Sequence, residues 1–208
     1  VYFTDSEVRR SGRMTAAQRR QRDRLERQFG RPDPRAVLKD VTHLLEVVAG
    51  GQRRLVVLSD EHQAYPKAIR RLRCAVEHLV TSSRARRDAS NRLYPVNLAD
   101  LLLRHGSANH KRETIAWSKR RQASAERLAV FVVWRNYMNG RREKVRGSPS
   151  PAQVREMRSD RLSVGELLER RLFPSRIALP GRWDDYYWRR VKTRALGRQR
   201  SHGLKYAA

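Results

Sequence analysis

The fold is decided by the stretch GGQRRLVVLSDEHQAYP, residues 50–66, in which an apolar run leads into a cluster of polar side chains. A continuous apolar run over residues 55–58, after a glycine turn, is typical of a central buried strand. Asp60 follows directly on that strand, where α/β enzymes place functional carboxylates above a rigid strand end. Asp60 is therefore a candidate functional residue. The alternative is that Ser59 or Asp60 only caps the next helix.

The elements around this strand predict an α/β layer. Before it we expect a strand-like run over residues 1–4, a charged helix over 16–29 capped by Thr15, and an amphipathic helix over about 37–48. After it we expect a short helix over 65–73 and a second strand over 75–81. The order strand, helices, strand, helix, strand is typical of a mixed sheet flanked by helices.

The rest of the chain is predicted to be helical and basic. An Arg-rich loop over residues 82–94 is followed by helices from about 98, over 109–121 and over 123–138. A Ser-Pro linker covers 148–151, a short helix begins at 163, and an Arg- and aromatic-rich tail begins at 177. We therefore expect a core domain over 1–142, and a second region over 143–208 made of linker, short helices and basic tail.

Charge is the dominant feature of the composition. The 208 residues include 47 Lys and Arg against 21 Asp and Glu, a formal net charge of +26. Self-repulsion on this scale favours a polyanionic partner, and phosphate backbones are the usual one. Arg also suits bidentate phosphate contacts, although these runs could equally be solvated helix faces. The candidate nucleic-acid-binding residues are Arg84, Arg86, Arg87, Lys111, Arg112, Lys119, Arg120 and Arg121.

The sequence also excludes several classes of protein. A single cysteine, Cys74, rules out an intramolecular disulfide framework and a Cys-based zinc knuckle. The longest apolar run, residues 128–134, is far too short for a membrane span. We therefore expect a cytoplasmic, nucleoid-associated protein with no membrane partner.

Glu113 is the second candidate carboxylate. It lies in the first turn of the helix predicted over 109–121, and paired carboxylates of this kind bind Mg²⁺. The alternative is an exposed Glu favoured by the helix dipole. Glu126 competes for the same role, but it lies 13 residues further on and points to a different face of a continuous helix.

Several short segments, in order and spacing, resemble bacterial insertion-sequence transposases of the DDE class. SDEHQAYP (59–66) resembles their second-aspartate segment, and NHKRETI (109–115), AERLA (125–129) and WRNY (134–137) resemble the third segment with its helix-borne Glu. SEVRRSGRM (6–14) and NRLYPVN (91–97) are similar to members of one subgroup. The resemblance covers most of the chain to about Arg142.

The resemblance implies a partial ribonuclease H-like core and DNA transposition by metal-dependent cleavage and strand transfer. Asp60 and Glu113 would then be catalytic and would bind a pair of Mg²⁺ or Mn²⁺ ions, with His62 and His110 as possible neighbours of the metal ligands. The first Asp of the triad belongs on an earlier strand, and Asp5 is a weak substitute for it. We therefore expect a chain that lacks the amino-terminal part and has little activity alone.

Two other functions remain open. One is a non-enzymatic basic protein that binds RNA, ribosomes or other nucleic acids through the same Arg faces. The other is a structural partner that assembles through the helix over residues 128–137, and a homo-oligomer on DNA is compatible with either. In the tail, Trp183 and Tyr187 could stack on bases or pack onto the body of the protein.

Overall fold

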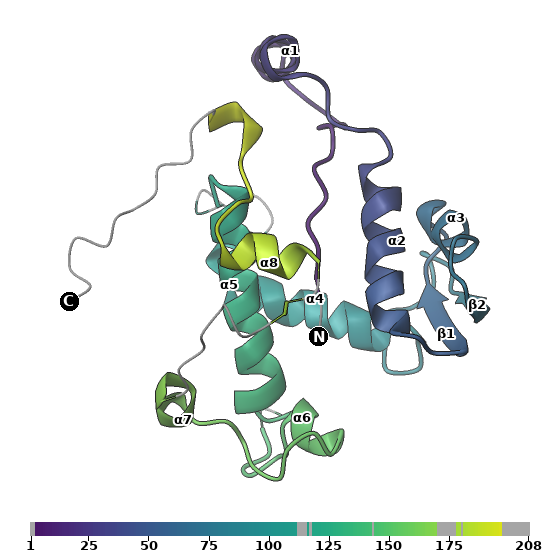
Figure 1. Cartoon of the computed structure of the whole chain (residues 1–208), viewed down its shortest axis with the longest axis vertical. Coiled ribbons are helices and arrows are strands. Elements are labelled where there is room, and N and C mark those ends of the chain that lie inside the picture. Colours follow the sequence, from purple (N-terminus) through teal and green to yellow (C-terminus); the bar gives the residue numbers. More distant parts are fainter. Residues whose placement is uncertain are drawn as a thin grey trace. The chain divides into compact units, whose positions relative to one another are not determined.

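The computed structural model describes residues 3–111, 116, 118–142, 144–169, 178–179 and 181–196. These residues form two compact units (Figure 1). The sheet unit contains residues 3–101 and 192–196, and the helical unit contains the described residues between 102 and 191. The boundary falls between Leu101 and Leu102, inside helix α4 (Tyr94–Gly106).

The sheet unit begins with the capped helix that the sequence predicts. Helix α1 (Ala16–Phe29) starts at Thr15, whose side chain accepts from the Gln18 N–H while the Gln18 side chain accepts from the Thr15 N–H. Gly30, with φ of 82°, ends it. The strand predicted over residues 1–4 is wrong for its described part, because Phe3 and Thr4 are not in a strand. Instead, Arg9 fastens this segment to α1 through Glu26, at 2.7 and 3.3 Å.

Helix α2 (Ala36–Ala49) packs on the short helix α3 (Ala64–Ile69), and the two lie side by side in Figure 1. Ala68 on α3 is completely buried. Gly50 ends α2 in the left-handed conformation, as its position after the apolar stripe predicts. Helix α3 is shorter than predicted. The carbonyls of Ala68 and Ile69 accept from the N–H groups of Arg71 and Leu72, which are three residues ahead and form a turn in place of further α-helix.

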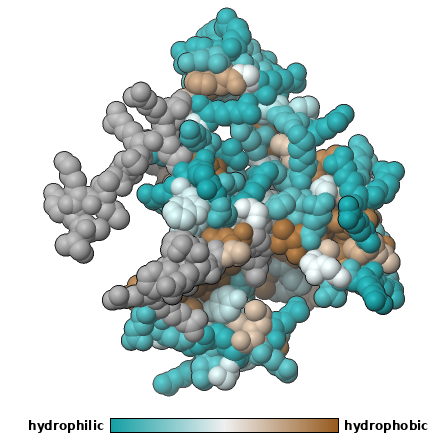
Figure 2. All heavy atoms as spheres, viewed as in Figure 1, coloured by the Kyte–Doolittle hydropathy of each residue, from teal (hydrophilic) through white to brown (hydrophobic). Residues whose placement is uncertain are grey.

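The two strands form a parallel pair. Strand β1 (Arg54–Ser59) and strand β2 (Ala75–Val80) run in register from Arg54 opposite Ala75 to Ser59 opposite Val80. Both lie where the sequence predicts strands. The expectation of a buried central strand is wrong, because burial alternates along β1 and leaves Val56 57% exposed. Hydrophobic atoms are visible at the surface in the region of α2 and β1 (Figure 2).

The helical unit contains one long helix and several short ones. Helix α5 (Arg121–Val133) continues as the π-helix η2 (Trp134–Met138), which confirms the helix predicted over 123–138. The helix predicted over 109–121 is wrong for the described residues: a single 3₁₀ turn, η1 (Ala108–His110), is followed by non-helical backbone at 111 and at 118–120. The remaining elements are α6 (Pro151–Val154), α7 (Val164–Glu169) and α8 (Arg182–Tyr187), while η4 (Arg194–Leu196) belongs to the sheet unit.

The Ser-Pro segment over 148–151 is part of the packed structure and not a linker. Ser150 is completely buried and caps α6 by accepting from the Gln153 N–H at 3.3 Å. Ser148 is 5% exposed, and its hydroxyl accepts from the Arg142 N–H at 2.9 Å. A hydroxyl group that accepts from a nearby backbone N–H can be buried with its oxygen satisfied, which is consistent with the burial of this segment of turn residues.

The protein is thus a mixed helix and strand fold with a small parallel sheet. Among the described residues, every helix is too short or too polar to cross a bilayer.

Candidate nucleic-acid interface at the carboxyl edge of the sheet

The parallel pairing of β1 and β2 brings two polar loops to one edge of the sheet. The loop after β1 begins with Asp60, and the loop after β2 begins with Thr81, whose N–H donates to the Ser59 carbonyl at 2.8 Å. Ser59 is 3% exposed. Its hydroxyl donates to the Asp60 carbonyl at 2.8 Å, so the His78 Nε2, 2.7 Å away, must carry the hydrogen of the Ser59–His78 bond.

Asp60 is exposed at this edge and is only partly engaged. Its Oδ1 accepts from the His62 N–H at 3.0 Å, and its Oδ2 has no hydrogen-bond partner in the described chain. The expectation that Asp60 lies at a strand end is confirmed. The alternative that it caps the following helix is wrong, because the Ala64 N–H of α3 donates to His62 Nδ1 at 3.2 Å instead. Burial, with a smaller contribution from the Asp60 charge, raises the pKa of Tyr65.

Glu61 joins the two loops. Its Oε2 accepts from the Ser83 N–H and the Ser83 hydroxyl, both at 3.0 Å, and from the Ser82 hydroxyl at 3.5 Å. These bonds, led by the one from the Ser83 backbone, lower the pKa of Glu61. This role could not be predicted from the sequence, because a Glu whose partner serine lies 22 positions away looks like any other surface Glu.

The Arg-rich loop after β2 adds positive charge at the same edge of the sheet as Asp60. Arg84, Arg86 and Arg87 are all exposed. Arg86 is paired with Asp88 at 3.1 Å, whereas Arg84 and Arg87 have no ion-pair partner in the described part of the chain. Two guanidinium groups at the carboxyl edge are therefore available to an external anion.

A metal centre is not complete in the part of the chain that the structure describes. No group of three His, Cys, Asp or Glu side chains there is placed to hold an ion. Asp60 offers one free carboxylate oxygen, which is a ligand of the kind that Mg²⁺ prefers. Glu113 and Arg112 lie outside the described residues, so their predicted roles stay predictions.

The other predicted basic residues lie in the helical unit. Lys111 and Lys119 are exposed, while Arg120 and Arg121 are partly buried and have interaction partners. His110 is also partly buried, and its Nε2 has no hydrogen-bond partner among the residues that the structure describes. Burial, followed by the charge of Arg127, lowers the pKa of His110. An uncharged His110 is therefore favoured near neutral pH.

Glu126, the competitor of Glu113, is engaged inside the helical unit. Arg189 donates to its Oε1 at 2.8 Å and to its Oε2 at 3.2 Å, and Gln122 also donates to Oε1, at 3.0 Å. The Arg189 hydrogen bond, then the Gln122 bond, lowers the pKa of Glu126. Arg189 adopts a left-handed φ of 55°, a conformation that costs about 1 kcal/mol or more for a non-glycine residue. Glu126 therefore acts as a structural ion-pair partner between α5 and the turn after α8.

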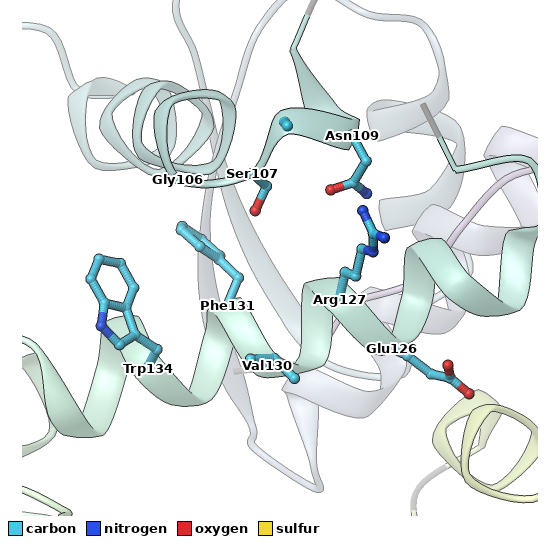
Figure 3. Close-up of a pocket in the computed structure, with 9 residues that line it drawn as sticks. Gly106, Ser107, Asn109, Glu126, Arg127, Val130, Phe131 and Trp134 are labelled. Carbon is cyan, nitrogen blue, oxygen red and sulfur yellow. The ribbon is translucent and has the colours of Figure 1, made fainter. Parts of the chain in front are cut away.

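A cavity of about 560 Å³ lies between α5 and the turn after α4. Figure 3 shows Phe131 and Trp134 on one side of α5, with Arg127 extending toward Asn109 and Glu126 directed away toward α8. The rings of Phe131 and Trp134 have centroids 6.0 Å apart and are tilted by 42°, so they pack against each other and not as a parallel stack. The sequence pattern could not predict this cavity, because its far wall comes from the 3₁₀ turn that replaces the predicted helix.

The aromatic tail is partly packed and partly exposed. Tyr186 on α8 is 8% exposed, and its carbonyl accepts from Gln122 at 2.6 Å. Tyr187 and Trp188 remain exposed and contact each other edge to face at 5.5 Å. Arg190 is paired with Asp184 and Asp185. Helix α8 therefore packs through Tyr186, and Trp183 is partly buried, whereas Tyr187 is exposed.

Comparison of the chain with protein-family models, curated proteins and solved structures finds no match.

Proposed function

We propose that the chain acts on DNA as a transposase of the DDE class, and that its α/β core is a partial ribonuclease H-like core. One observation supports this proposal most. Asp60, with a free Oδ2, lies at the carboxyl edge of a parallel strand pair, and the unpaired Arg84 and Arg87 follow the second strand at the same edge. The order of the DDE-like segments around Asp60 and Glu113 adds to it.

The residues at this edge have separable roles. Arg84 and Arg87 attract the phosphate backbone, and their affinity falls as salt rises because binding releases counterions. The His62 N–H donates to Oδ1 of Asp60, and Oδ2 would accept an incoming cation. Glu113 would supply the second carboxylate. In this class a divalent ion polarises the scissile phosphate.

The test combines DNA binding with thermal unfolding in the presence of Mg²⁺ or Mn²⁺. Binding to duplex DNA that weakens with salt, together with metal-dependent stabilisation that is lost in Asp60→Asn and Glu113→Gln, is the expected result. Asp23→Asn is the matched control, because Asp23 lies on α1 and not at the sheet edge, and among the described residues its carboxylate pairs with Arg22. A chain that does not bind DNA contradicts the proposal.

A non-enzymatic nucleic-acid-binding protein is the second candidate, and α1 favours it. This helix buries none of its residues and carries the exposed arginines Arg19 and Arg20, which need no catalytic site to bind a phosphate backbone. DNA or RNA binding that is unaffected by divalent ions in the wild type and in Asp60→Asn would favour this candidate over the transposase.

A further inference from the structure

A second cavity, of about 500 Å³, lies at the opposite, amino-terminal edge of the parallel sheet. The turn that follows α2 forms one wall, and the segment between α3 and β2 forms another. Arg53, directly before β1, and Arg71 and Arg73, before β2, line it together with Glu46 and Cys74. None of these residues belongs to the candidate interface at the carboxyl edge.

The three arginines of this cavity are not neutralised within the described chain. Arg53, Arg71 and Arg73 are exposed and have no ion-pair partner there. Their neighbour Arg54 differs, because its guanidinium is paired with Glu77 at 3.0 Å on the open face of the sheet. Glu46 is the only carboxylate in the lining. The cavity therefore has an excess of positive charge that the described part of the chain does not balance.

The three arginines could instead cap the carboxyl ends of the neighbouring helices, because Arg side chains often bind the last carbonyl groups of a helix. Here, backbone N–H groups already bind carbonyl groups at these helix ends. The Glu46 and Ala49 carbonyls of α2 accept from the N–H groups of Gly50 and Gln52. The Ala68 and Ile69 carbonyls of α3 accept from the next turn. Even with about half a negative charge at each helix end, the three guanidinium groups leave the cavity with a net positive charge.

We propose that this cavity binds a backbone phosphate of DNA, at a second contact separate from Asp60. The inference rests on the proposed function, since the phosphate belongs to the bound DNA. Guanidinium groups bind phosphate oxygens in pairs and remain charged at any physiological pH. Strands of six residues separate the two edges of the sheet by about 20 Å. A DNA strand that reaches both edges therefore spans about six nucleotides.

Cys74 provides the readout, because it is the single cysteine of the chain, lines the cavity and is partly exposed. The rate of its modification by the uncharged reagent N-ethylmaleimide is measured with and without a duplex of about 20 base pairs, which is longer than the sheet. With DNA at about ten times its Kd, the free fraction is about one-eleventh, so the rate should fall about tenfold. The variant R53Q/R71Q/R73Q should lose this protection.

R54Q and R53Q form the matched pair of single variants. Each removes one positive charge at adjacent positions, but R53Q removes a lining residue and R54Q removes one that is paired with Glu77. R53Q should weaken the protection of Cys74 and R54Q should retain it. Because both side chains are exposed, neither substitution should unfold the protein, and circular dichroism checks this.

Fluorescence anisotropy on the same DNA distinguishes a failure of the proposed function from a failure of the proposed phosphate contact in the cavity. If no DNA binds at all, the proposed function fails. If DNA binds but Cys74 reacts at its free rate, only the present inference is overturned. Equal protection in R53Q/R71Q/R73Q and wild type also overturns it, as does protection by inorganic phosphate with none by DNA.

Discussion

The carboxylate of Glu61 binds both the backbone N–H and the hydroxyl of Ser83 at 3.0 Å. The two residues are 22 positions apart, and each follows a different strand of the parallel pair. This contact joins the loop that carries Asp60 to the loop that carries Arg84. The geometry of the candidate interface therefore depends on a residue that binds neither a metal nor DNA in our proposal.

Glu61→Gln should loosen the loop after β2. The Ser83 bonds lower the pKa of Glu61 from its ordinary value of 4.5, so the contribution of the carboxylate is present above that value and is lost as pH falls through the folded-state pKa. We expect faster hydrogen exchange at the Ser83 amide in Glu61→Gln at neutral pH. In the wild type, the same amide should lose protection as the pH falls below 4.5, through the lowered pKa of Glu61. Exchange at Ser83 that is the same in both proteins would show that Glu61 does not hold the loop.

Arg84→Gln and Arg87→Gln should each weaken DNA binding and lower the slope of log K against log salt by about 1. Arg86→Gln is the control in the same loop, because Arg86 is already paired with Asp88. We expect it to change the slope less than the other two. Salt titrations followed by anisotropy measure all three variants. Equal effects at the three positions would mean that only net charge matters there.

Glu126→Gln should reduce the stability of the protein without affecting its metal response. The ion pair with Arg189 is partly exposed, with side-chain exposures of 39% and 54%, and pairs of this kind contribute about 0–1 kcal/mol. Urea unfolding measures the loss. A loss of Mg²⁺ or Mn²⁺ stabilisation in Glu126→Gln would instead identify Glu126, and not Glu113, as the carboxylate of the third segment.

Ala68→Leu should disturb the packing of α3 on α2. Ala68 is completely buried, and added methylenes in a filled site cost about 1–3 kcal/mol. Ala17→Leu, on the exposed surface of α1, adds the same atoms with no such cost. Urea unfolding compares the two. A stability for Ala68→Leu equal to that of Ala17→Leu would show that this site is not packed.

Local signals allowed much of the fold to be predicted from the sequence. Thr15, Gly30 and Gly50 bound the first two helices where capping chemistry predicts. The apolar runs of β1 and β2 also lie where periodicity predicts them. Burial was predicted less well. The run over 55–58 indicated a strand covered on both faces, whereas one face carries the exposed Val56 and the Arg54–Glu77 pair, because coverage depends on elements far away in the chain.

The candidate site, too, could be predicted from the sequence only in part. The position of Asp60 follows from the chain alone, because it comes directly after an apolar run. Its neighbours do not: the parallel register of β1 and β2 decides that Arg84 and Ser83 lie at the same edge. Likewise, the pairing of Glu126 with Arg189 joins residues 63 positions apart, and no periodicity in the sequence encodes such a contact.

The most direct test of the central claim is the Mn²⁺ affinity of the protein–DNA complex, measured by electron paramagnetic resonance for the wild type, Asp60→Asn and Asp23→Asn. Loss of even an outer partner of a metal ligand costs about 10–100-fold in affinity. We therefore expect Asp60→Asn to weaken Mn²⁺ binding by at least about tenfold, with Asp23→Asn unchanged. Equal Mn²⁺ affinity in the wild type and Asp60→Asn would contradict the assignment of Asp60 as a metal ligand, and with it the DDE-class proposal.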